Sequence, residues 1–108
     1  MNLTEKLKRR YASKMMNGEK IDNQKFEQIK EAIRLAPTSL GLQPFKVYIV
    51  ENQELKQTIF DEAASGQPQI PQCSQLFVFA ALRKITKEII DDYFNLIDVT
   101  RDLPKEKL

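Results

Sequence analysis

Two arginines followed by a tyrosine form the first group of side chains that could do chemistry. Arg9, Arg10 and Tyr11 are consecutive in the sequence. Guanidinium groups bind phosphate through forked pairs of hydrogen bonds, and a phenol hydroxyl adds a further donor. The same residues lie where a short N-terminal helix is expected to end, and the helix dipole favours basic side chains there. The segment therefore predicts either an anion site or a solvated helix end.

A bend rich in small residues forms the second group. Pro37 stops the preceding helix because proline has no amide hydrogen and disfavours helical backbone in the residue before it. Thr38 and Ser39 supply hydroxyl groups, Leu40 follows them, and Gly41 allows positive φ or the close approach of a ligand. Such a segment can hold a ligand, or it can simply connect a helix to a strand.

Two carboxamides lie in the third group. Gln67 and Gln69 belong to a segment with three glutamines and two prolines, which predicts a rigid polar loop between residues 66 and 72. Each carboxamide offers both donors and an acceptor, as the edge of a planar heterocycle requires. A polar loop without a function remains the alternative.

Composition excludes several kinds of chemistry. The 108 residues contain no histidine and a single cysteine, Cys73. Zinc sites of the usual kind, internal disulfides and catalytic pairs that need histidine are therefore not expected. A formal net charge of +2 gives little reason to expect nucleic acid or an anionic membrane as partner. A nucleic-acid surface made by Lys6, Lys8, Arg9 and Arg10 is the weaker alternative.

The three groups must be positioned by helices and strands of one domain, residues 1–108. Apolar residues recur at spacings of three and four in the helical segments, and two apolar runs have the length of strands. The longer run, Leu76 to Leu82, is too short to cross a bilayer, so a cytoplasmic location is expected. Both strands are apolar on both faces, which predicts burial between layers and a need for neighbouring strands. Helices are expected after the capping residues Asn2 and Asp22, from Asn52 to about Ala64, and after Thr86. Strands are expected over residues 45–51 and 76–82. The last helix is expected to give way at Asp98 to a charged, proline-broken segment.

Taken together and in this order, the segments resemble the N-terminal half of the nitroreductase family. The resemblance rests on Arg9-Arg10-Tyr11-Ala12-Ser13-Lys14, on Ala36-Pro37-Thr38-Ser39-Leu40-Gly41-Leu42-Gln43-Pro44-Phe45-Lys46, and on Gln67-Pro68-Gln69-Ile70 before an apolar strand. It implies an α+β, nitroreductase-like FMN-dependent fold with helices packed on both faces of a small mixed β-sheet. Because family members are longer, the chain is expected to be an incomplete, truncated copy.

The resemblance also implies roles for the candidate residues in binding FMN. The arginine of the first segment, Arg9, would contact the flavin phosphate or the ribityl chain, with its two neighbours beside it. The bend would reach across a dimer interface to the flavin bound mainly by the other subunit, and the carboxamides would face the ribityl and pyrimidine side of the ring. The implied cofactor-binding residues are Arg9, Arg10, Tyr11, Pro37, Thr38, Ser39, Leu40, Gly41, Gln67 and Gln69.

The implied function is an FMN-dependent oxidoreductase that passes electrons from NAD(P)H to nitroaromatic, quinone or similar acceptors. The cofactor supplies this chemistry, so no catalytic side chain and no metal are expected. The implied partners are a second copy of the chain, in a homodimer with flavin at the interface, and a small-molecule electron acceptor, without nucleic acid or membrane. The alternative is a non-catalytic truncated α+β domain that acts as a dimerisation or partner-binding module.

Overall fold

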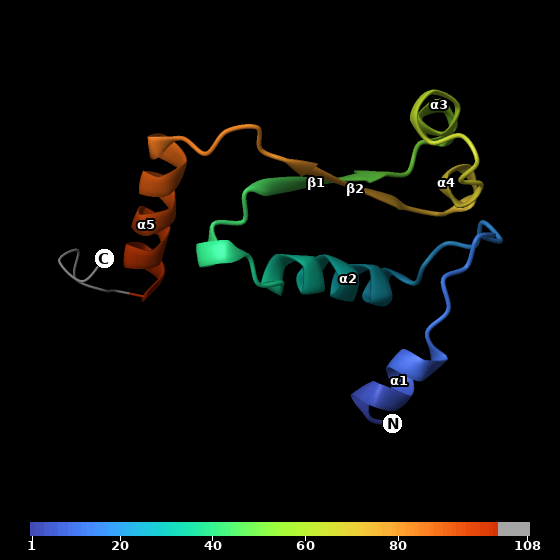
Figure 1. Ribbon diagram of the computed structural model, residues 1–108, viewed down its shortest axis with the longest axis horizontal. Helices are drawn as coiled ribbons and strands as arrows, with labels where there is room; N and C mark the ends of the chain where they lie inside the picture. The colour runs from blue at the N-terminus through green and yellow to red at the C-terminus, as the bar shows by residue number, and fades with distance from the viewer. Residues whose placement is uncertain (102–108) are drawn as a thin grey trace. The chain divides into compact units, whose positions relative to one another are not determined.

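The structure is a computed structural model that describes residues 1–101 (Figure 1). Its helices and strands, in chain order, are α1 (Leu3–Arg9), α2 (Asn23–Leu35), the short 3-10 turn η1 (Ser39–Gly41), β1 (Phe45–Val50), α3 (Gln53–Ala63), α4 (Gln69–Gln72), β2 (Leu76–Ala81) and α5 (Lys87–Arg101). The α+β class expected from the sequence is confirmed.

The helices begin at the capping residues that the sequence predicts. Asn2 and Glu5 form a reciprocal capping box at the start of α1, in which both hydrogen bonds are 2.9 Å long. The side chain of Asp22 accepts a 2.7 Å hydrogen bond from an amide in the first turn of α2, and that of Asn52 accepts one of 2.8 Å in α3. Thr86 does the same at 3.3 Å in α5. Each side chain satisfies an amide that would otherwise lack a partner within the helix.

The sheet of the described residues consists of β1 and β2 alone. The amide of Leu82, directly after β2, donates a 2.9 Å hydrogen bond to the carbonyl of Pro44, directly before β1. The beginning of one strand thus lies beside the end of the other, which makes the pair antiparallel. The mixed sheet expected from the sequence is present among residues 1–101 only as this antiparallel pair, and α3 and α4 lie in the connection between its strands.

The chain falls into two compact units. One unit joins Met1–Phe26 to Ile49–Val78, and the other joins Glu27–Tyr48 to the part of the chain that begins at Phe79. Both units are therefore made of segments that are far apart in the sequence. The first unit contains the arginine segment and the glutamine segment, and the second contains the bend after α2.

Apolar packing within each unit is loose. In the first unit the rings of Phe26 and Phe77 have their centres 6.0 Å apart, and in the second Phe45 and Phe79 lie 6.1 Å apart. No apolar side chain among residues 1–101 is buried, and Phe79 of β2 is 61% exposed. The expectation that both strands are buried between layers is wrong for this chain, because each strand has only the other as a neighbour within the described sheet.

Two further expectations need correction. The segment expected to be a loop contains the single helical turn α4, and the last helix continues through Asp98 to Arg101 instead of giving way at Asp98. The remainder of the charged, proline-broken segment, residues 102–108, lies outside the described part of the chain.

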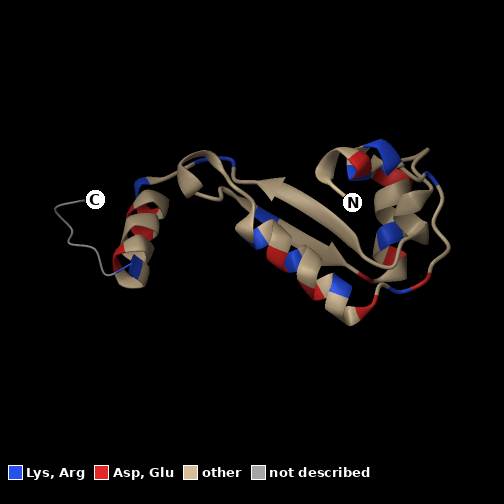
Figure 2. Cartoon of the chain, turned by 90° about the horizontal axis from the view of Figure 1, so that it is seen from below, with Lys and Arg blue, Asp and Glu red and all other residues tan. Residues whose placement is uncertain are grey.

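Basic and acidic residues alternate along α2 (Figure 2). Among residues 1–101, no helix combines the length and the apolar character needed to cross a membrane.

Candidate functional site

The arginine segment lies at the C-terminal end of α1 with its side chains in solvent. Arg9 is the last residue of the helix, Arg10 is its C-cap, and Tyr11 is 84% exposed. The Arg9 guanidinium has one weak partner, the Met1 sulfur at 3.8 Å. Within residues 1–101 the Arg10 and Tyr11 side chains have no hydrogen-bonding partner, so their donors remain available to an anion.

The bend after α2 is held together by its own hydrogen bonds. The hydroxyl oxygen of Thr38 accepts from the amide of Gln43 at 3.0 Å, and its carbonyl accepts from the amide of Gly41 at 2.9 Å. The carboxamide of Gln43 donates to the carbonyl of Arg34 at 2.7 Å, which ties the bend to the last turn of α2. The bend therefore has a defined shape even though most of its side chains are exposed.

The backbone of the bend is left-handed at neighbouring positions. Leu40 has φ 56°, Gly41 has φ 70°, and Gln43 has φ 48°. A β-carbon on Gly41 would lie 2.9 Å from the hydroxyl of Tyr93 in α5, so the dihedral angle favours glycine and a larger residue would require the Tyr93 side chain to shift. Leu40 has a β-carbon, which disfavours positive φ. A residue other than glycine in the left-handed region is uncommon and strained, and it often marks a functional segment. Its side chain is 80% exposed.

Gln67 and Gln69 contact each other directly. The Nε2 atom of Gln69 donates a 2.9 Å hydrogen bond to Oε1 of Gln67. The Oε1 atom of Gln69 is buried and has no hydrogen-bonding partner. A buried acceptor without a partner is unfavourable, and such atoms are rare in folded proteins. The pair thus offers a free acceptor on Gln69 beside the free donors of Gln67 Nε2, which suits an imide edge with alternating N–H and C=O groups.

The arginine segment and the glutamine segment both belong to the first unit, whereas the bend belongs to the second. No hydrogen bond or ion pair within residues 1–101 joins the arginine segment to Gln67 or Gln69. Sequence reasoning named the two glutamines, which the structure joins by a hydrogen bond, but it missed Gln43, which ties the bend to α2, and Tyr93, whose hydroxyl lies against Gly41. A signal existed for Gln43, because a carboxamide soon after a helix end can cap its carbonyls; none existed for Tyr93, which is distant in sequence.

An apolar groove lies beside the bend in the second unit. Leu40 and Leu42 form one wall, and residues of α5 form the other, with a cavity volume of about 280 Å³. Tyr93 and Phe94 are stacked in a tilted pair with ring centres 5.5 Å apart. The groove residues from α5 are Ile90, Tyr93, Phe94 and Ile97. An exposed apolar groove of this kind is suited to another apolar surface.

The described residues contain no group of histidine, cysteine, aspartate and glutamate side chains that could hold a metal ion. The single cysteine, Cys73, is a free, half-buried thiol that donates to the carbonyl of Ile70 at 3.1 Å. The polar groups in the candidate segments are guanidinium, hydroxyl and carboxamide groups, which suit an organic anion or a heterocycle.

Comparison with known proteins identifies the family of this chain. The family model "Nitroreductase family" matches residues 7–106. The chain is 33% identical over 92 residues to the major NAD(P)H-flavin oxidoreductase of Aliivibrio fischeri, covering 81% of this chain and 41% of that protein. It is 31% identical over 80 residues to a Staphylococcus haemolyticus protein provisionally named an NAD(P)H nitroreductase, covering 73% of this chain and 37% of that protein.

A solved structure has the same fold. The crystal structure of a nitroreductase-like protein from Streptococcus mutans superposes with a TM-score of 0.76 and 18% sequence identity, over 98% of this chain and 52% of that one. The chain spans about two fifths of the length of the two curated relatives and about half of that structure. From the match to the family model over residues 7–106, we conclude that this chain belongs to the nitroreductase family.

Proposed function

We propose that this chain binds FMN and forms part of an NAD(P)H-dependent flavin oxidoreductase of the nitroreductase type. Family membership and the names of the relatives support flavin and NAD(P)H use. When bound, the flavin accepts hydride from NAD(P)H and passes electrons to a nitroaromatic, quinone or similar small molecule. A cytoplasmic location, without nucleic acid or membrane as partner, belongs to the same proposal.

The observation that carries the proposal is the buried, unpartnered Oε1 of Gln69. A flavin ring has an N–H flanked by carbonyl groups, which could donate to this acceptor once the Gln69 carboxamide turns to expose Oε1, while Gln67 Nε2 donates to a neighbouring carbonyl. A bound heterocycle therefore supplies the partner that the folded chain lacks. Arg9, Arg10 and Tyr11, with donors directed to solvent, bind the phosphate of the same cofactor.

The bend supplies its residues to the flavin of a second copy of the chain. Its backbone is fixed by hydrogen bonds, and Leu40 projects into solvent beside an apolar groove. In the proposed homodimer, Pro37, Thr38, Ser39, Leu40 and Gly41 of one subunit cover the ring bound by the partner. The absence of buried apolar side chains among residues 1–101 supports such pairing, because association buries apolar surface.

The first prediction tests the phosphate contact. Arg9→Ala should weaken FMN binding by roughly 1.5–3 kcal/mol, or about 10- to 150-fold, since a hydrogen bond to a charged group is lost. The measurement is a fluorescence titration of FMN with the purified protein. Arg83→Ala, which removes an exposed arginine outside the three segments, is the matched control and should leave the affinity unchanged. Equal affinities for all three proteins would reject the role of Arg9.

The second prediction separates binding from stability at Gln69. Gln69→Met removes the unpartnered acceptor while keeping the length of the side chain. Because that acceptor is buried without a partner, the substitution should leave the unfolding midpoint of the FMN-free protein unchanged or higher, while FMN affinity falls about tenfold or more. Thermal unfolding and the fluorescence titration measure the two effects. A variant that is less stable yet binds FMN normally would show that Gln69 has only a structural role.

A further inference from the structure

Lys56 in α3 is the one buried residue of the described chain, with 3% of its surface exposed. Its Nζ atom donates to the carbonyl of Cys73 at 2.5 Å. The ion pairs among residues 1–101 involve other lysines and arginines, so no carboxylate neutralises this ammonium group. An ammonium has three hydrogens to donate, and buried charges are ordinarily paired with an opposite charge. Within residues 1–101 the ammonium group thus has one acceptor, the Cys73 carbonyl, and no ion-pair partner.

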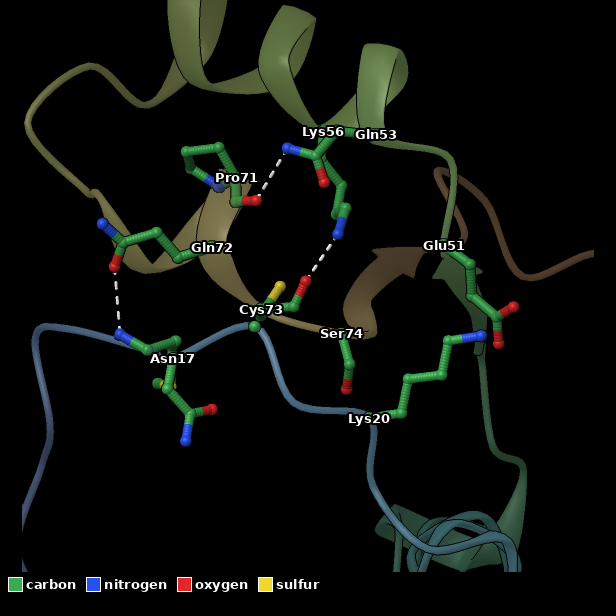
Figure 3. A pocket seen from close by; sticks show the side chains of 11 residues that line it. Asn17, Lys20, Glu51, Gln53, Lys56, Pro71, Gln72, Cys73 and Ser74 are labelled. Carbon is green, nitrogen blue, oxygen red and sulfur yellow. Dashed lines mark hydrogen bonds between the residues drawn. The ribbon is translucent and has the colours of Figure 1, made fainter.

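A cavity of about 450 Å³ lies at this side chain, within the first unit. Figure 3 shows the Lys56 side chain extending from α3 toward the carbonyl of Cys73. Gln53 donates to the carbonyl of Pro71 at 2.8 Å, and the amide of Met16 donates to Oε1 of Gln72 at 3.0 Å. These two bonds connect α3, α4 and the segment after α1, so three separate parts of the chain form the walls.

The charges around the cavity favour an anion. Lys20 and Lys56 line it, together with a single carboxylate from Glu51, so two positive charges face one negative charge and leave a net charge of +1. Lys20 and Glu51 lie on the same side of the cavity in Figure 3, whereas Lys56 extends from α3. Among residues 1–101 neither lysine forms an ion pair with Glu51, so the lining keeps its excess positive charge. None of the ten residues proposed to bind FMN lines this cavity.

We propose that this cavity is a second binding site, specific for a small oxyanion such as phosphate or a carboxylate, with Lys56 Nζ as its principal donor. The anion accepts the hydrogen bonds that the Cys73 carbonyl cannot, and it supplies the missing counter-charge. Lys20 supplies a second positive charge in the lining. The site is separate from the residues proposed to bind flavin, so the chain should bind a free oxyanion and FMN independently.

The single cysteine provides a direct probe, because Cys73 also lines the cavity and no other thiol is present. Its alkylation by iodoacetamide, an uncharged reagent, is followed by mass spectrometry in the full chain at constant ionic strength, with chloride replaced by inorganic phosphate. We expect phosphate to slow alkylation saturably and several-fold. Acetate in a parallel series distinguishes a carboxylate from a phosphate as the preferred oxyanion.

Two lysine variants test whether phosphate protects Cys73 by binding at Lys56. Lys56→Met should weaken protection by phosphate at least tenfold, while Lys84→Met, which removes an exposed lysine outside the cavity, should leave it unchanged. The FMN affinity of Lys56→Met should equal that of the unmodified chain, so a failure of either proposal is recognised separately. If Lys56→Met does not fold, the proposal is decided by the alkylation rates of the unmodified chain with and without phosphate or acetate. An alkylation rate that neither phosphate nor acetate changes, or protection by FMN alone, would overturn the oxyanion site.

Discussion

At the scale of single residues, two side chains and one glycine have roles that their charge or polarity alone does not indicate. Gly41 holds left-handed backbone against the Tyr93 hydroxyl, Gln69 keeps a buried acceptor without a partner, and Lys56 is buried without a counter-ion. The last two are costly in a folded chain unless something satisfies them. Both are therefore positions where a ligand is expected, whereas Gly41 serves the shape of the bend.

Gly41 gives a prediction that separates two sources of strain. Gly41→Ala should lower the free energy of unfolding by about 1–2 kcal/mol or more, because a β-carbon is disfavoured at positive φ and would also meet the Tyr93 hydroxyl at 2.9 Å. Adding Tyr93→Phe removes that hydroxyl and should restore part of the loss. Urea unfolding of the two single variants and the double variant measures the coupling. Strictly additive losses would mean that the close contact has no energetic consequence.

At the scale of elements, local sequence decides where helices begin but not how far they extend or what covers them. Asn2, Asp22, Asn52 and Thr86 cap the helices as expected, because a capping side chain acts on amides only two or three residues away. The α4 turn was missed because Pro68 and Pro71 suggested a loop. Proline is tolerated in the first turn of a helix, where its missing amide hydrogen would have no partner.

The caps of α3 and α1 should differ in their effect on stability. Asn52→Ala should lower the free energy of unfolding by about 1 kcal/mol, since α3 carries buried Lys56 and contributes to the packing of its unit. Asn2→Ala should instead loosen α1 locally, because that helix buries no residue. Denaturant unfolding combined with amide hydrogen exchange resolves the two effects. Similar global losses from both substitutions would contradict this distinction.

At the scale of the whole molecule, the class of the fold follows from the sequence, but long-range contacts do not. The order of helices and strands is read from periodicity and from apolar runs. The contact between Gly41 and Tyr93 joins residues that nothing local relates, and the burial of Lys56 contradicts the ordinary preference of lysine for solvent. The ten residues proposed to bind FMN remain a prediction that follows from the family resemblance.

The proposed homodimer gives a test of the apolar groove. Phe94→Asp places a charge in the groove and should shift the chain toward the monomer, because burying an unpaired carboxylate at an interface is unfavourable. Val99→Asp is the matched control, since Val99 is also in α5 and is 82% exposed but does not line the groove. Sedimentation velocity measures the mass of each variant. Monomers for all proteins, including the unmodified chain, would exclude the shared flavin site.

The division of the chain into two units has a consequence for how such a protein can evolve. The chain crosses from one unit to the other after Phe26, after Tyr48 and after Val78. These crossings fall inside α2, β1 and β2. Neither unit is a continuous stretch of gene, and no step between them coincides with a linker. Recombination that transfers one uninterrupted segment therefore cannot carry either unit whole without also carrying part of the other.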